Sequence, residues 1–288
     1  MVLITPKITN LGYSNLWTDM STILGYASNF AQQIQKLFAN GEQGFFYDPN
    51  DLSTMFQDAA GTIPITAAGQ PVGLMKDKSG RNNHASQTVS SSRPILQRNA
   101  TTGAYYLVFD GVDDFFITNS IDFTATDKVS LFAGVRKLSD AATGIICELS
   151  NNSDLTVSGV FRLSAPAFSG ASKYAMGSRG DAAIIVQATT TDVSFNAPNS
   201  SALTAKAQIS NDSVLLRVNG SQVELNTADQ GKGNYGNYSL YIGRRGGISL
   251  PFNGHLYSLI GIGRLTADSE TIALEKAIAK NVGVTLNV

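Results

Sequence analysis

From residue 44 to residue 262 the chain is a succession of short apolar or alternating segments separated by turn residues. Asp110-Gly111 and Asn219-Gly220 each join two such segments, and dipeptides of this kind favour the tight turns of β-hairpins. A period of two places one face of a strand in a core, whereas a helix needs a period near 3.6. The pattern therefore predicts an all-β sandwich or barrel. The predicted strands are 44–47, 105–109, 115–118, 129–135, 144–149, 159–163, 182–188, 193–195, 203–209, 214–218, 222–225, 240–243 and 255–262.

Composition agrees with one β domain of low charge. The 288 residues can bury one large sandwich core, and 27 glycines with only 15% charged residues suit short strands joined by turns. The net charge of −1, with no basic run longer than Arg244-Arg245, argues against a nucleic-acid partner. No apolar run approaches the ~20 residues that span a bilayer, and residues 1–7 lack the pattern of a secretion signal. The only cysteine, Cys147, has apolar neighbours and is predicted to lie in a buried strand.

In the segment before the predicted strands, apolar residues repeat with a different period. Asn15 can cap a helix that begins at residue 16, and Asn40-Gly41 can end it. Apolar residues recur in this segment at alternating spacings of four and three, which is the seam of a coiled coil. The seam residues are Leu16, Met20, Ile23, Ala27, Phe30, Ile34 and Leu37.

Two interpretations of this helix are open, because an amphipathic helix can pack on its own domain or on another chain. Its position before the strands, after an apolar arm at residues 2–8, favours the second. We therefore expect residues 1–41 to form an arm and a docking or oligomerising helix, with a trimer as the expected oligomer. Residues 42–288 would form the sandwich. A second helix is predicted over 267–281, with Thr266 as its cap and a narrow apolar face that suits the edge of the sandwich.

Three acidic residues share one turn: Asp110, Asp113 and Asp114. Carboxylate oxygens are calcium ligands, so this turn is a candidate calcium site. The alternative, which we favour, is a solvated β-turn in which the aspartates only shape the backbone. The two histidines, His84 and His255, are too few for a structural zinc site, and no other cofactor is indicated.

A loop rich in glycine and tyrosine, residues 231–238, is a candidate sugar-binding element. Tyr235 and Tyr238 could stack on a sugar ring beside Arg244 and Arg245. The alternative is a hairpin loop whose tyrosines cover the edge of a sheet.

Several motifs occur in a fixed order along the chain. They are G-F-F-Y-D-P-N-D-L-S-T-M-F-Q-D at 44–58, D-x-S-G-x-x-N-H-A at 77–85, F-D-G-x-D-D at 109–114, Y-I-G-R at 241–244 and F-x-G-x-L-Y at 252–257. This set resembles the concanavalin A-like, or laminin G-like, jelly-roll domains found in virion proteins of tailed phages, over residues 42–288. The resemblance implies an all-β jelly-roll sandwich.

The same resemblance implies a non-enzymatic structural protein on the particle surface, as a tail fibre or head decoration, folded in the host cytoplasm. Its partners would be a neighbouring virion protein or a host glycan. The alternative is a glycan-degrading hydrolase on the same fold. Glycosidases on this fold usually carry a run such as E-x-D-x-E in one strand, which places two carboxylates side by side. No such run occurs here, and the chain has only five glutamates.

Overall fold

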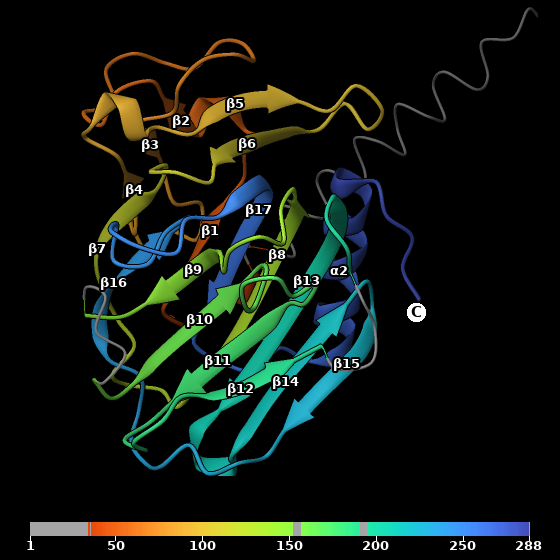
Figure 1. The fold of residues 1–288 in the computed structure, drawn as a ribbon. Helices are drawn as coiled ribbons and strands as arrows, with labels where there is room; N and C mark the ends of the chain where they lie inside the picture. Colours follow the sequence, from red (N-terminus) through yellow and green to blue (C-terminus); the bar gives the residue numbers. More distant parts are fainter. Residues whose placement is uncertain (1–33, 35, 152–156, 191–194, 288) are drawn as a thin grey trace, which may run out of the picture.

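The chain folds into two antiparallel β-sheets packed face to face, with one helix on the outside (Figure 1). A computed structural model describes residues 34, 36–151, 157–190 and 195–287. None of the described helices is long and apolar enough to span a membrane.

Sheet A has the order β15-β14-β13-β8-β17-β6-β5, and β1 also pairs with β17. Its strands are β1 (Gly44–Tyr47), β5 (Ile95–Arg98), β6 (Tyr105–Asp110), β8 (Lys128–Lys137), β13 (Asn199–Gln208), β14 (Ser213–Val218), β15 (Ser221–Asn226) and β17 (Asn253–Ile262).

Sheet B has the order β12-β11-β10-β9-β16-β7-β4-β3-β2. Its strands are β2 (Met55–Phe56), β3 (Leu74–Met75), β4 (Ala85–Ser86), β7 (Phe116–Asp122), β9 (Ile145–Leu149), β10 (Val160–Ser164), β11 (Ala175–Arg179), β12 (Val186–Thr189) and β16 (Asn237–Ile242). Short 3₁₀ turns lie at Leu52–Thr54, Ser90–Ser92 and Ile209–Asn211.

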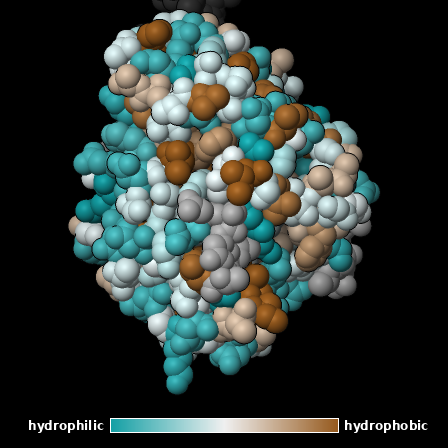
Figure 2. All heavy atoms as spheres, turned by 60° about the vertical axis from the view of Figure 1, so that its left-hand side comes forward, coloured by the Kyte–Doolittle hydropathy of each residue, from teal (hydrophilic) through white to brown (hydrophobic). Residues whose placement is uncertain are grey.

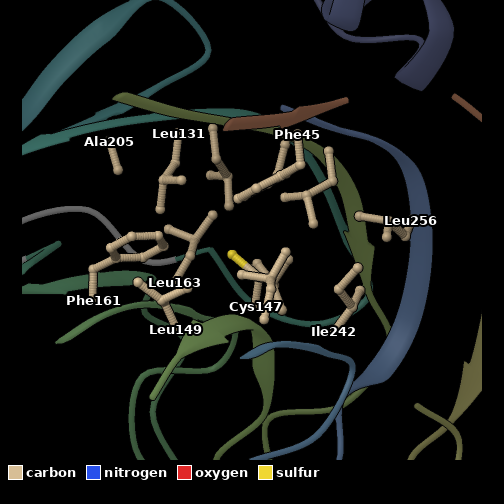
Figure 3. Packing of buried hydrophobic residues seen from close by; sticks show 14 of the residues in the cluster. Phe45, Leu131, Cys147, Leu149, Phe161, Leu163, Ala205, Ile242 and Leu256 are labelled. Carbon is tan, nitrogen blue, oxygen red and sulfur yellow. The ribbon is translucent and has the colours of Figure 1, made fainter. Parts of the chain in front are cut away.

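The main core lies between the sheets and is built by the predicted alternation. Apolar side chains from both sheets point toward one another in this layer (Figure 3). Those labelled there are Phe45, Leu131, Cys147, Leu149, Phe161, Leu163, Ala205, Ile242 and Leu256. Burying each large side chain contributes roughly 1.5–3 kcal/mol. The prediction for Cys147 is confirmed: burial raises the pKa of its thiol to about 12, so the thiol stays protonated and acts as a small apolar group.

The turn chemistry is as predicted at the clearest hairpin. Asn219 and Gly220, between β14 and β15, have φ angles of 51° and 84°. A type I′ turn needs positive φ at both central positions, which asparagine and glycine tolerate best. Gly111 in the acidic turn also has a positive φ, 77°.

The motif at 77–85 joins a loop to strand β1. The Asp77 carboxylate accepts hydrogen bonds from the backbone N–H groups of Phe46, Ser79 and Asn83, at 2.8–3.0 Å. The backbone N–H of Asp77 donates to His84 Nδ1 at 3.0 Å. His84 thus has a structural role in its turn.

A second apolar layer covers the outer face of sheet A. Helix α2 (Asp268–Val282) lies against β8, β13 and β17, on the side of sheet A away from β9–β12 (Figure 1). Its position across the sheet corrects the predicted position at an edge, because its apolar face includes Leu274, Ile278 and Val282, all buried. The cap is also corrected. Glu270 Oε2 accepts from the backbone N–H of Ala267, whereas the Thr266 hydroxyl pairs with Thr271.

The end of the N-terminal helix belongs to the same layer. Ile34, Leu37 and Phe38 are buried there beside α2 and β17, and the helix ends before Gly41, whose φ is 87°. Arg81 and Arg264 donate to the backbone oxygens of Phe38 and Leu37. The packed domain therefore includes residues before the predicted boundary at 41.

Most predicted strands are present, and the differences have local reasons. The strand predicted at 182–188 begins only at Val186, and residues 193–194 lie outside the described residues. Strand β11, Ala175-Met-Gly-Ser-Arg179, was not predicted because small residues hide its alternation, although all five residues are buried. Strand β2 was not predicted, whereas β3, β4 and β5 are short β pieces of the kind expected in an extended arm between residues 58 and 99.

Candidate functional site

A line of polar residues crosses five neighbouring strands on the outer face of sheet B. Each is flanked in its strand by core residues, so its side chain points away from the core. Strand register places the five positions side by side. We call them the polar row: Gln187 (β12), Gly177 (β11), Arg162 (β10), Glu148 (β9) and Tyr241 (β16).

Glu148, at the centre of the polar row, is fully buried and already has two partners. Its Oε2 lies 3.0 Å from Arg245 Nε, and its Oε1 accepts from the Ser150 hydroxyl at 3.0 Å. Arg245 comes from the segment just after β16 and is itself 16% exposed. The carboxylate is therefore neutralised by Arg245 rather than by its cross-strand neighbour Arg162.

Arg162 has no acceptor. In the part of the chain that the structure describes, its guanidinium makes no hydrogen bond, and its Nε is buried without a partner. A side-chain carbon at Gly177 would lie 3.2 Å from Arg162 Cγ and Nε, so the arginine stem rests across that glycine. Burial and the neighbouring Arg245 charge lower the pKa of Arg162 to about 10.

Other polar atoms around the row lack partners within the described residues. They are Gln187 Oε1 and one terminal nitrogen of Arg245, Nη2, both buried. A buried donor without an acceptor costs about 1–3 kcal/mol, and more when it is charged. Such groups are few in native proteins, and each calls for an explanation such as a functional role or a bound water or ion.

The chemistry of the row suits binding rather than hydrolysis. It offers guanidinium donors and an amide, with one excess positive charge because two arginines face one carboxylate. Glycosidases of the usual type need two carboxyl groups about 5–9.5 Å apart. The row has one, and that one is held by Arg245 and Ser150.

Figure 2 shows the molecule with the left-hand side of Figure 1, where β7 and β16 lie, turned toward the viewer. Apolar side chains form separate clusters among polar ones on this side. The picture does not suggest one continuous apolar docking surface there.

The sequence-predicted sugar-binding residues do not form one site. Tyr235 is 1% exposed, and its hydroxyl pairs with Ser178 at 2.7 Å, so it is a core residue; this corrects the prediction. Tyr238 packs on the core, and its hydroxyl donates to the backbone oxygen of Ser158. Arg244 and Arg245 follow the other end of β16, about 20 Å away at ~3.3 Å per residue. Of the four, only Arg245 contacts the polar row.

Near the predicted loop there is an open hollow of about 710 Å³ lined by residues 181–182, 209–212 and 229–233. Two of its carboxylates accept hydrogen bonds from the backbone: Asp212 accepts from Gln230 N–H, and Asp229 accepts from Gly231 N–H. We assign no ligand to it.

The predicted acidic cluster is present in the turn after β6. One oxygen from each of Asp110, Asp113 and Asp114 lies within 4.8 Å of the others. Yet Asp110 Oδ1 accepts from the N–H groups of Val112 and Asp113, and Asp114 Oδ2 accepts from Asp110 N–H. Asp113 accepts from the Ser92 hydroxyl at 2.6 Å. These hydrogen bonds indicate that the three aspartates stabilise the turn. Calcium binding by them stays a sequence-based hypothesis.

The seam residues divide into two groups. Ile34 and Leu37 are 3% and 2% exposed and pack on sheet A and α2 of the same chain. They are not free for a partner, which corrects their assignment to a docking surface. The other five positions lie outside the described residues, so their oligomerising role stays a prediction: Leu16, Met20, Ile23, Ala27 and Phe30.

No family model matches the chain, and no curated protein matches its sequence. Solved structures resemble it in fold. A receptor binding domain of botulinum neurotoxin mosaic serotype C/D has a TM-score of 0.51 at 10% identity, over 80% of this chain and 51% of that one. A second structure of the C/D mosaic receptor binding domain has a TM-score of 0.50 at 10% identity, over 70% and 48%. CBM40 of the Ruminococcus gnavus IT-sialidase, bound to α2,3-sialyllactose, has a TM-score of 0.42 at 18% identity, over 52% and 83%.

This chain thus spans about half the length of the botulinum domains. The fold is a lectin-like β-sandwich. The predicted concanavalin A-like architecture is confirmed to this extent: the chain is mostly β, with two antiparallel sheets and one helix near the C-terminus. The phage part of the expectation stays a prediction.

Sequence reasoning missed Arg162, Glu148 and Tyr241 as a group. A signal existed, because Glu148 in Ile-Ile-Cys-Glu-Leu and Arg162 in Val-Phe-Arg-Leu are single charges inside apolar strands. Alternation puts such a charge opposite the core face. What the sequence did not reveal is that β9, β10 and β16 are neighbours.

Proposed function

We propose that this chain is a non-enzymatic carbohydrate-binding β-sandwich that attaches a tailed-phage particle to a host glycan through the polar row. One observation carries the glycan part: polar side chains with unused donors lie on the outer face of sheet B rather than in the core between the sheets. Sugars present many hydroxyl oxygens that can accept from such donors.

The phage part of the proposal is supported by the ordered motifs at 44–58, 77–85, 109–114, 241–244 and 252–257. The likeness to toxin receptor binding domains supports the architecture only, because one sandwich can carry many ligands. Attachment to a neighbouring virion protein would fall to residues 1–33, through the arm and the first part of the helix.

Glycan-array binding of the purified full chain tests the proposal. We expect binding to at least one class of immobilised glycan, and loss of that binding in Arg162→Gln. The matched control is Arg98→Gln, an exposed arginine on β5 of sheet A, far from the row in strand order. Failure of the wild-type chain to bind any glycan would contradict the proposal.

A reducing-sugar assay on each bound glycan separates binding from hydrolysis. We expect no release of sugar, because the row offers a single carboxylate. Turnover that depends on Glu148 would replace the binding proposal with the hydrolase. Antibody labelling of particles by electron microscopy tests the virion location independently.

A further inference from the structure

Arg162 is a charged group whose guanidinium makes no ion pair or hydrogen bond with any residue that the structure describes. Its cross-strand neighbour Glu148 is fully buried, and both carboxylate oxygens are engaged, one by Arg245 and one by Ser150. Its other cross-strand neighbour is Gly177, which brings no side chain at all. The two neighbours in its own sheet therefore leave the guanidinium unsatisfied.

Among the described residues, Ile185, Gln187 and Arg245 add no anion to the surroundings of Arg162. The Ile185 side chain lies close to Gly177, where a side-chain carbon would come within 2.9 Å of its Cδ1. Gln187, opposite Gly177 in β12, adds an amide without charge. Arg245 adds a second positive charge, and it keeps Glu148 from turning toward Arg162.

From this arrangement we infer that the glycan bound by the polar row is acidic, and that a carboxylate or sulfate ester on the sugar accepts hydrogen bonds from the Arg162 guanidinium. The inference rests on the proposed function and names its ligand class. A guanidinium presents parallel donors that match the two oxygens of a carboxylate or sulfate, and such paired bonds are the stronger ones in proteins. An anion would also relieve the repulsion between Arg162 and Arg245.

Glycine at position 177 fits this role. Because it has no side chain, the Arg162 stem lies flat on the strand and the head stays beside the row rather than standing off the sheet. Arg245 acts as a positioning residue. Because it pairs with Glu148, the guanidinium of Arg162 remains available to the ligand.

The test is an NMR titration of the arginine Nε–H signals of the full chain, with the Arg162 signal assigned by its loss in Arg162→Lys. The probes are glucuronate, glucose 6-sulfate, glucose and inorganic sulfate at equal ionic strength. We expect glucuronate or glucose 6-sulfate to shift the Arg162 signal in a saturable way, and glucose to shift it little. Which of the two acids binds identifies the acidic group.

The affinity for the acidic sugar should fall about tenfold or more in Arg162→Gln and stay within twofold in Arg98→Gln. A higher salt concentration should lower the affinity for the acidic sugar, because the contact is ionic. Inorganic sulfate that shifts Arg162 as strongly as the sugars would overturn the inference, since the site would then hold an anion without recognising a sugar.

The two proposals can fail separately. If the chain binds neutral glycans and Arg162→Gln leaves that binding intact, the acidic-ligand inference is wrong and the proposed function stands. If no glycan binds in the array, both fail.

Discussion

At the scale of single residues, the structure contains a charge that opposes folding. Arg162 loses water on β10 and gains no hydrogen bond among the described residues, so the folded state carries a cost of about 1–3 kcal/mol that the unfolded chain does not. Residues of this kind persist when a function requires them. Removing the guanidinium while keeping the stem should therefore help folding.

We expect Arg162→Met to raise the free energy of unfolding by about 1 kcal/mol, or the melting temperature by ~2–4 °C. Methionine keeps the contact over Gly177 and removes the charge. Urea titration followed by circular dichroism measures the change, with Arg98→Met as the control. A stability loss in Arg162→Met would mean that the arginine has a structural partner, which would weaken the case for a ligand.

Glu148 should behave in the opposite way. It is fully buried beside Arg245, and Glu148→Gln leaves two arginines without a counter-charge. Breaking a buried ion pair of this kind costs about 3 kcal/mol. Adding Arg162→Met to Glu148→Gln should recover part of that loss in a double-mutant cycle. Independent, additive effects would show that Arg162 and Glu148 do not interact.

The acidic turn predicts a dependence of stability on pH. Burial, and then the charges of Asp110 and Asp113, raise the pKa of Asp114 from an ordinary value of 3.8 to about 6. The folded state therefore holds this proton more tightly than the unfolded state does. The stabilising contribution is complete below pH 4 and is lost as the pH rises through 6.

In Asp114→Asn the thermal stability should change less between pH 4 and pH 7 than in the wild type. Melting curves across that range, with Asp229→Asn as an exposed control, measure the difference. An unchanged pH profile in Asp114→Asn would assign the pH dependence to another group.

At the scale of elements, the strands were easier to predict than their arrangement. Alternation and turn dipeptides identified strands such as β8, β13 and β14 because one face of each is apolar throughout. The pairing of β9 with both β10 and β16 depends on contacts between distant segments, which no local pattern encodes. For that reason Arg245 could be named from the sequence, and its partner Glu148 could not.

The N-terminal helix shows the same limit. Its period predicted a helix and an apolar stripe, yet the stripe alone did not reveal which surface it covers. The structure assigns Ile34 and Leu37 to the outer face of sheet A. A helix of the length predicted from the sequence, 16–38, can pack on the domain at one end and on a partner at the other.

We expect two seam substitutions to separate these roles. Leu37→Asp places an unpaired carboxylate in a packed layer and should lower the melting temperature of the sandwich. Phe30→Asp, at a position outside the described residues, should convert an oligomer to monomer and leave that melting temperature nearly unchanged. Sedimentation velocity and calorimetry measure the two effects. If the wild-type chain is already monomeric at micromolar concentration, the predicted self-association is wrong.

At the scale of the whole molecule, the two faces of the sandwich have different coverings. The outer face of sheet A is closed by α2 and by the end of the N-terminal helix, which pack there through an apolar layer. The outer face of sheet B carries the polar row. The polar row and the layer formed by α2 with residues 34–38 therefore lie on opposite sides of the core.

A crystal structure of the full chain with glucuronate tests the central claim most directly, because it locates the ligand rather than inferring it. We predict the sugar on the outer face of sheet B, with its carboxylate within hydrogen-bond distance of the Arg162 guanidinium. A saturating ligand ordered elsewhere, for example in the hollow beside residues 229–233, would contradict the assignment of the polar row as the binding site.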